Sequence, residues 1–145
     1  MTLMTTNVAS QDRLTMTASD FDRLSHLLES PQYRVSHAAL LTALKQELDR
    51  SEVVPPSSVP KGVVTMHSQV RMRDLKTRDT ETYTLVYPDK ADIDEGKLSV
   101  LAPLGVALLG TRAGQVVEVA APAGLRRIKV ERVLYQPEAA GDYHL

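Results

Sequence analysis

Apolar residues recur at helical spacing in two segments of the N-terminal third of the chain. The first stripe consists of Phe21, Leu24, Leu27 and Leu28. It follows Ser19 and Asp20, either of which can accept a hydrogen bond from a free backbone N–H group at a helix start. Pro31 ends this predicted helix, because the residue before a proline is driven out of the helical region.

The second stripe begins after Ser36 and consists of Leu40, Leu44 and Leu48. The link over residues 30–35 is short, which favours an antiparallel hairpin. Helices of about 11 and 16 residues would reach about 17–24 Å at the usual rise per residue. We expect them to bury their stripes chiefly against each other.

From Val63 onward the apolar period changes to two, which is typical of β-strands. Candidate strands span residues 63–66, 69–75, 81–87, 97–101, 115–121 and 125–134. Pro103 suits the first turn of a single helix, and Gly110 can end it. The pattern predicts a twisted antiparallel sheet packed against one short helix, and thus an α+β domain.

These patterns divide the chain into four segments. Residues 1–18 are rich in Thr and Met without sustained periodicity and are predicted to be a flexible leader. Residues 19–52 form the helical hairpin, a short coiled coil. Residues 53–61 contain three prolines and two serines, which indicates a linker. Residues 62–145 form the sheet domain.

The composition narrows the classes of function. The chain has 17 basic and 18 acidic residues, and so lacks the basic excess of a tight, unaided nucleic-acid binder. This balance favours a protein partner. The absence of cysteine excludes disulfides, zinc ribbons and thiol nucleophiles. With no bilayer-spanning stretch and no secretory pattern, a cytoplasmic protein without membrane contact is expected.

Two further residue classes bear on the chemistry of the chain. The histidines show no metal-binding spacing, so neither a metal nor another cofactor is predicted; they are His26, His37, His67 and His144. A basic run along the last strand allows a weak contact with nucleic acid or an acidic partner, although a solvated strand face is the favoured interpretation. That run is Arg126, Arg127, Lys129 and Arg132.

The segment from Val63 to Tyr135 resembles the C-terminal domain of the Gre transcript-cleavage factors. The resemblance runs in order through VVTMHSQVRMRDL, ETYTLVYPDKADIDEGKLSVLAPLGVALLGTRAGQVVEV and IKVERVLY. Residues at the family's spacing include Asp92, Ile93, Gly96, Ser99, Pro103, Ala107, Leu108, Gly110 and Gly114. The C-terminal YQPEAAGDYHL, the short leucine hairpin and the PQY turn are similar to one branch, the Rnk proteins, or regulators of nucleoside diphosphate kinase.

The resemblance implies a fold, a partner and a mode of action. It implies a coiled coil followed by an FKBP-like domain of the GreA/GreB C-terminal type. It implies binding of RNA polymerase at the rim of the secondary channel, in competition with Gre-type factors. DNA or RNA would then be met only through the polymerase, and a monomer is expected.

The hairpin tip decides whether cleavage chemistry is expected. Gre factors place paired carboxylates at the tip, where they hold a magnesium ion and orient a water. Here Glu29 is the one carboxylate between Asp22 and Glu47, and a lone carboxylate binds magnesium weakly. We therefore predict no catalytic residues. Glu29 and Gln32 mark the tip, Glu29 can equally be a solvated surface residue, and Tyr33 either stacks on the polymerase or covers the hairpin's end.

The resemblance places the polymerase contact at the corner between a strand and the short helix. The corner consists of Leu101, Ala102, Pro103 and Leu104. Ala102 replaces a serine that is common in Gre factors, which removes one hydroxyl from this contact. Alternatively, Pro103 only begins a helix, and Leu104 and Leu108 only fill the core. Both interpretations can hold at once, with Leu108 in the core and Ala102 and Pro103 exposed. Asp92 and Asp94 lie in an acidic loop that can meet basic polymerase residues or can be a solvated turn.

The function predicted is that of a non-enzymatic transcription regulator that binds RNA polymerase. Two alternatives stay open: an active transcript-cleavage factor, and a direct regulator of nucleoside diphosphate kinase. Prolyl isomerase activity is not expected. The chain has no Trp and a single Phe, too few aromatic residues to line the deep pocket of an isomerase.

Overall fold

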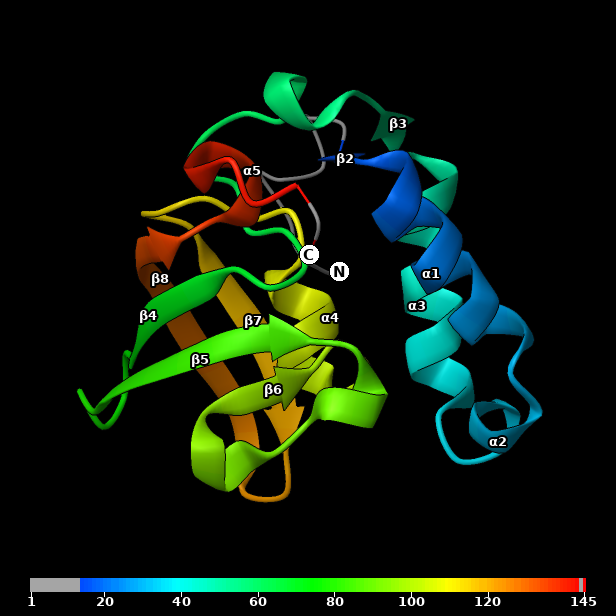
Figure 1. Cartoon of the computed structure of the whole chain (residues 1–145). Coiled ribbons are helices and arrows are strands. Elements are labelled where there is room, and N and C mark those ends of the chain that lie inside the picture. The colour runs from blue at the N-terminus through cyan, green and yellow to red at the C-terminus, as the bar shows by residue number, and fades with distance from the viewer. Residues whose placement is uncertain (1–13, 144) are drawn as a thin grey trace.

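The computed structural model describes residues 14–143 and 145, and its N-terminal part is a helical hairpin (Figure 1). Helices α1 (Ala18–Glu29) and α3 (Ala38–Asp49) run side by side, joined by the single turn of α2 (Pro31–Arg34). Pro31 ends α1 as predicted, because its fixed backbone fits the first turn of the next helix instead. Each long helix has 12 residues, so the second is shorter than expected.

The helix starts differ from the sequence prediction. Thr17 caps α1, its hydroxyl accepting a hydrogen bond from the Asp20 N–H at 3.2 Å, so neither Ser19 nor Asp20 is the cap. The second long helix begins at Ala38 rather than after Ser36, because the residues before it form α2 and a turn. Asp20 is thereby released for a buried role described below.

The predicted leader is wrong for its last residues, while residues 1–13 lie outside the described part of the chain. Strand β2 (Thr15–Met16) pairs in parallel with β3 (Glu52–Val53), which follows the hairpin. The Leu14 and Met16 side chains are buried in the core. Apolar burial thus fixes a segment whose local sequence carries no periodic signal.

The predicted linker over residues 53–61 is held firmly against the sheet domain. It contains β3 and the 3₁₀ turn η2 (Pro56–Ser58), and Val59 is buried. The Gln136 side-chain amide donates to the carbonyl oxygens of Pro60 at 2.9 Å and Val63 at 2.6 Å. These bonds tie the chain entering the domain to the end of its last strand.

A five-stranded sheet forms the centre of the second part. Its strands are β4 (Gln69–Asp74), β5 (Thr80–Val86), β6 (Lys97–Ser99), β7 (Val116–Ala121) and β8 (Gly124–Tyr135). The order is β6-β5-β4-β8-β7, antiparallel except for the parallel pair β5·β6. Parallel pairing follows from the loop over residues 87–96, which contains the turns η3 (Pro88–Lys90) and η4 (Ile93–Glu95) and returns the chain to the same end of the sheet.

Residues 63–66 do not form the predicted strand. Only an isolated bridge joins Val63 to Arg112, although residues 63–66 are all buried. Their apolar pattern therefore reports burial and not strand pairing. The short helix α4 (Pro103–Leu108) is present as predicted, and a further turn of helix, α5 (Pro137–Ala140), follows the last strand.

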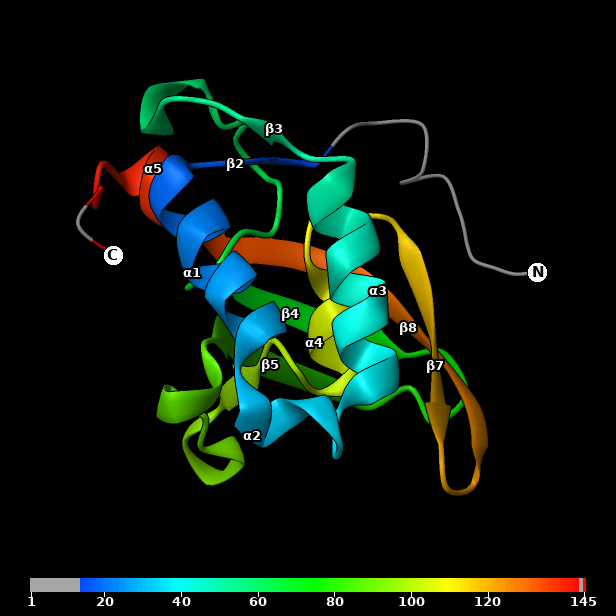
Figure 2. The same cartoon turned by 90° about the vertical axis from the view of Figure 1, so that its right-hand side faces the viewer.

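The hairpin packs on the sheet domain, with α4 between α3 and the sheet (Figure 2). One hydrophobic cluster contains Leu24, Leu44 and Leu48 of the hairpin together with Val100, Leu104 and Leu108 of the domain. The two stripes pack against each other, as expected, and they also take part in the core of the sheet domain, which the sequence did not indicate. The predicted α+β class, a helical hairpin followed by a sheet domain with one short helix, is confirmed.

Candidate functional site

The corner between β6 and α4 offers two of its four residues to a partner. Pro103 is exposed and Ala102 is half-buried, whereas Leu101 is 2% and Leu104 9% exposed. Leu101 and Leu104 therefore belong to the core and do not form a contact surface, contrary to the sequence prediction. Their side chains are fixed in the packed interior, and they therefore hold the backbone of the corner in place.

Ser99 and Gly105 set the shape of this corner. The Ser99 hydroxyl accepts a hydrogen bond from the Leu101 N–H at 3.0 Å, and its carbonyl accepts one from the Ala102 N–H at 3.0 Å. A Cβ atom at position 105 would lie 2.1 Å from the Ser99 carbonyl oxygen, so only glycine fits there. Helix α4 therefore starts in direct backbone contact with β6, and Pro103 is held at the surface.

The acidic loop before β6 carries Asp92 and Asp94. Both side chains are exposed, and between them Ile93 is 57% exposed. The backbones of Asp92 and Lys97 exchange two hydrogen bonds of 2.9 Å, which closes the loop at the start of β6. Because β6 has only three residues, the acidic loop and the Pro103 corner stand at the two ends of one short strand.

The hairpin tip has little capacity for metal chemistry. Glu29 and Gln32 are exposed, and the ring of Tyr33 packs edge-on against His37 with ring centroids 5.5 Å apart. Tyr33 is also partly buried against the hydrophobic core, and its two predicted roles both stay predictions. Within residues 14–143 and 145, no group of three acidic or histidine side chains could hold a metal ion. The Val35 side chain, which is 92% exposed, is a further apolar group at the tip that no pattern in the sequence indicated.

A buried polar cluster joins the hairpin to the sheet domain. The Tyr87 hydroxyl and the Arg23 guanidinium donate hydrogen bonds to Asp20 Oδ1 at 2.9 and 2.8 Å. The same guanidinium lies 4.7 Å from the centre of the Tyr87 ring. Burial raises the pKa of Asp20, which the bonds from Tyr87 and Arg23 only partly offset. Burial and the Asp20 carboxylate raise the pKa of Tyr87 well above its usual range.

The comparisons with known proteins fit this architecture. The family model "Transcription elongation factor, GreA/GreB, C-term" matches residues 59–135, and "Rnk N-terminus" matches residues 12–54. The chain belongs to the Rnk family of GreA/GreB-like transcription factors. The division between the two matches falls within the segment that carries β3 and η2.

Relatives of the Rnk family and of GreA are both found. The chain is 42% identical over 127 residues to the regulator of nucleoside diphosphate kinase of Escherichia coli K12, covering 87% of this chain and 92% of that protein. It is 38% identical over 96 residues to the transcription elongation factor GreA of Hyphomonas neptunium, covering 66% of this chain and 61% of that protein. These named relatives are a regulator and a transcription factor.

A solved structure shares the fold. The transcription elongation factor GreA/GreB from Nitrosomonas europaea superposes with a TM-score of 0.72 at 37% identity, covering 86% of this chain and 99% of that chain. The GreA/GreB-type fold expected from the sequence is thereby confirmed. No helix within the described part of this Rnk-family chain is long and apolar enough to cross a membrane.

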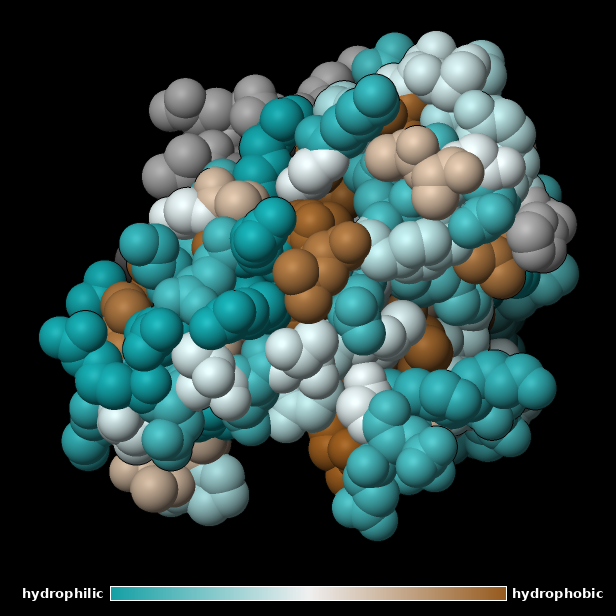
Figure 3. All heavy atoms as spheres, turned by 60° about the vertical axis from the view of Figure 1, so that its left-hand side comes forward, coloured by the Kyte–Doolittle hydropathy of each residue, from teal (hydrophilic) through white to brown (hydrophobic). Residues whose placement is uncertain are grey.

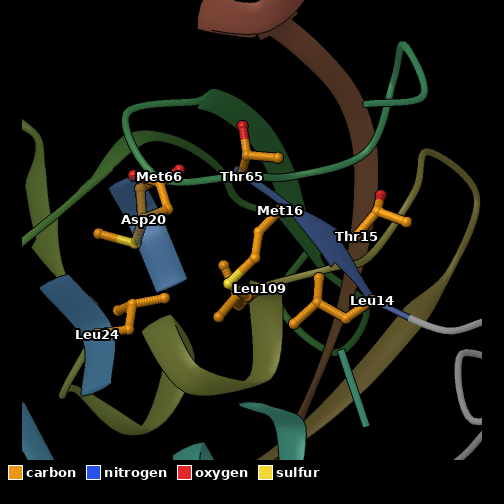
Figure 4. A pocket seen from close by; sticks show the side chains of 8 residues that line it. All are labelled: Leu14, Thr15, Met16, Asp20, Leu24, Thr65, Met66 and Leu109. Carbon is orange, nitrogen blue, oxygen red and sulfur yellow. The ribbon is translucent and has the colours of Figure 1, made fainter. Parts of the chain in front are cut away.

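Two hollows differ sharply in what they can hold. The first lies where β2, α1, the 65–66 segment and Leu109 meet (Figure 4). Its apolar side chains, among them Met16, Leu24 and Met66, fill it so completely that no water-sized molecule fits. It is therefore a part of the hairpin–domain interface and not a ligand site.

The second hollow is an open groove of about 540 Å³ on the sheet domain. It is lined by His67, Gln69, Thr84, Val86, Lys90, Lys97, Tyr135 and Leu145. Burial and the nearby Arg23 lower the pKa of His67, so its ring is neutral at pH 7. The groove has apolar and polar walls, which include Lys90 and Lys97, and the Tyr135 hydroxyl at its edge donates a hydrogen bond to Asp142. No local pattern in the sequence indicated this groove, because its residues come from distant strands.

Proposed function

We propose that this chain binds RNA polymerase at the rim of the secondary channel and competes there with Gre-type factors. The corner formed by the half-buried Ala102 and the exposed Pro103 is the primary contact, and Asp92 and Asp94 meet basic residues of the polymerase. Support comes from the GreA/GreB match over residues 59–135, which contains both features. The single observation that carries the proposal is an exposed Pro103 on a corner anchored by buried leucines.

The same protein would bind without stimulating transcript cleavage. Each long hairpin helix has 12 residues and so extends only about 18 Å. Glu29 is the one carboxylate in the tip, and magnesium needs several oxygen ligands in octahedral geometry. We propose a monomeric, cytoplasmic regulator that acts by occupancy, meets nucleic acid in its regulatory role through the polymerase, and carries out no reaction of its own.

Replacing Pro103 tests the contact. We expect Pro103→Asp to lower the affinity for core RNA polymerase at least tenfold, because a charge at the centre of a protein contact stays partly unpaired. The measurement is retention of purified polymerase on immobilised protein across a concentration series. Pro122→Asp, an exposed proline in the turn between β7 and β8, is the matched control and should bind as the wild type does. Equal binding by all three proteins would contradict the proposal.

A cleavage assay tests the absence of chemistry. Purified protein is added to backtracked elongation complexes with magnesium, and the RNA is followed on a gel. We expect no release of short 3′ fragments, and slower cleavage when the protein is added together with a Gre factor. Fragment release that disappears in Glu29→Gln would instead identify an active cleavage factor.

A second candidate function follows from the name of the Escherichia coli relative, a regulator of nucleoside diphosphate kinase. A direct effect requires a stable complex with that kinase. Purified kinase and purified polymerase are therefore offered in turn to the immobilised chain. Retention of the kinase without the polymerase would favour this second candidate over the first.

A further inference from the structure

The open face of the sheet carries a strong excess of positive charge. One face is covered by α4 and the hairpin, and the other is free of helices (Figure 1). On β4 the buried residues Val70 and Met72 alternate with Arg71 and Arg73, which therefore point to the open face. By the same alternation and register the basic side chains of this face are Arg71, Arg73, Lys97, Arg127, Lys129 and Arg132. We call this set the basic face.

An irregularity of β8 increases the density of charge. The register between β4 and β8 shifts between Arg71 and Met72, so that Glu131 and Arg132 both lie opposite Arg71. Glu131 confirms this orientation, since its carboxylate lies 3.4 Å from Arg71 Nε and 2.7 Å from Arg73 Nε. The bulge thus adds one more basic side chain to the open face than a regular strand would supply.

The basic face differs from the rest of the molecule in its charge. Glu118 and Glu131 are its two acidic residues, against six basic ones. The whole chain has 17 basic and 18 acidic residues. With Asp12 and Arg13 left aside, because they lie outside the described residues, 10 basic and 15 acidic residues are left elsewhere in the described part. A chain with nearly zero net charge therefore folds into one cationic face and an anionic remainder. This side of the molecule is covered mainly by hydrophilic side chains (Figure 3).

Several of these cations face one another without enough counter-charge. Arg71 lies directly opposite Arg132, and Arg73 directly opposite Lys129. Like charges in cross-strand pairs are destabilising, and the close ion pairs of Glu131 and Glu118 are with Arg71, Arg73 and Arg127. Within the described residues, Arg132 and Lys97 have no ion-pair partner, and Lys129 has only a more distant electrostatic attraction to Glu131. A row of cations maintained against repulsion indicates an anionic partner.

We propose that the basic face binds the phosphate backbone of a single nucleic-acid strand, independently of its sequence. Along β4 the basic positions recur every second residue, at Arg71 and Arg73, so these two rows are spaced by about 6.8 Å on that strand. Evenly spaced cations match the evenly spaced charges of a polyphosphate chain, whereas the carboxylates of an acidic protein surface are irregular. Guanidinium groups also fit phosphate oxygens through two parallel hydrogen bonds.

The groove can hold a base of the bound nucleic-acid strand. It lies at the end of the basic face, where Lys97, Thr84, Gln69 and Tyr135 form one row across four strands. The Tyr135 ring and the neutral His67 ring are surfaces on which a base can stack, and Lys90 and Lys97 stand beside them for the adjacent phosphate. This proposal goes beyond the polymerase contact and does not depend on it.

Fluorescence anisotropy with a labelled single-stranded oligonucleotide of mixed sequence tests this proposal. Full-length wild type is compared at several salt concentrations with the double variant Lys129→Gln/Arg132→Gln. The matched control is Lys61→Gln/Arg112→Gln, which removes two exposed cations from outside the basic face. We expect the Lys129/Arg132 variant to flatten the slope of log affinity against log salt by about 1.4, since each phosphate contact contributes about 0.7.

The outcomes separate the possibilities. We expect the Lys129/Arg132 variant to bind the oligonucleotide at least ten times more weakly than the wild type at low salt. The control variant should bind as the wild type does, and circular dichroism should show that both variants are folded. Absence of oligonucleotide binding by the wild type, or equal losses in the two variants, would overturn the proposal. Equal competition by a polyglutamate chain and by an unlabelled oligonucleotide would also overturn the proposal, because the basic face would then bind an acidic protein.

Discussion

At the scale of single residues, Asp20 is the side chain whose role the structure changes most. A residue expected to begin a helix is 3% exposed and receives hydrogen bonds from Tyr87 and Arg23. A buried carboxylate is tolerated only with such partners, because desolvation of its charge is expensive. Asp20 therefore fixes the first turn of α1 on the end of β5, and its stabilising effect depends on its protonation state.

Replacing Asp20 with asparagine gives a pH-dependent prediction. The pKa of Asp20 is raised above its ordinary value of 3.8, so the native state binds this proton more tightly than the unfolded chain does. Its contribution to stability is fully present below pH 3.8 and is lost as pH rises through the native pKa. In Asp20→Asn nothing titrates at this position. We therefore expect the variant's free energy of unfolding to rise relative to that of the wild type as pH increases from below 3.8 to neutrality.

Urea unfolding at a series of pH values measures this difference. Asp22→Asn, an exposed position on the same helix, is the matched control and should show no comparable trend. If the difference in free energy of unfolding between the wild type and Asp20→Asn stayed constant across the pH series, the role given to Asp20 would be ruled out.

At the scale of elements, α4 is positioned by contact with the β6 strand and not by its own helix propensity. It has six residues, including Gly105, and Leu104 and Leu108 face the core. An isolated helix of this length is not stable in water. The close approach of Gly105 to Ser99 allows α4 to begin directly on the sheet and to present Pro103 outward.

Gly105→Ala should therefore act against the usual trend. In a free helix this change stabilises by about 1 kcal/mol. Here the added Cβ would meet the Ser99 carbonyl oxygen at 2.1 Å, and backbone must move to relieve the overlap. We expect a loss of about 3 kcal/mol in the free energy of unfolding, measured by urea denaturation. Val106→Ala in the same helix should cost about 1 kcal/mol or less, and a neutral or stabilising Gly105→Ala would contradict the close packing.

At the scale of the whole molecule, the hairpin and the sheet domain share one core. Leu24 and Leu44 are fully buried in the cluster that also contains Leu108 and Val100. The parallel pairing of β2 with β3 and the Asp20 cluster add polar ties at the same junction. We therefore expect the two parts to unfold as a single cooperative unit, with the hairpin held beside the domain.

Leu44→Ala tests this cooperativity. Removing a fully buried leucine side chain lowers stability by about 2–5 kcal/mol. We expect helix loss, followed by far-UV circular dichroism, and tyrosine fluorescence to shift together to a lower urea concentration. Leu125→Ala, at a position 63% exposed, should change the stability by no more than about 0.5 kcal/mol. Separate transitions for the two probes would show that the hairpin unfolds independently.

The sequence by itself determined the order and kind of most elements, and with them the family. Stripes at Phe21, Leu24 and Leu44, the change of period after Val63, and the start of α4 at Pro103 are local signals that the structure preserves. They are readable because a helix or a strand repeats its own geometry along the chain. The sequence also showed that the tip has Glu29 as its one carboxylate, since that depends on composition alone.

Tertiary structure decided which of these residues are exposed and which charged side chains lie together on one face. Leu14, Met16, Leu101, Leu104 and Asp20 are all buried. The burial of each side chain depends on the distant segments that pack against it. The basic face arises in the same way: Arg71, Lys97 and Arg132 come from three strands whose register no local pattern fixes. Burial and charge segregation are properties of the packed chain, so they appear only when the sheet is assembled.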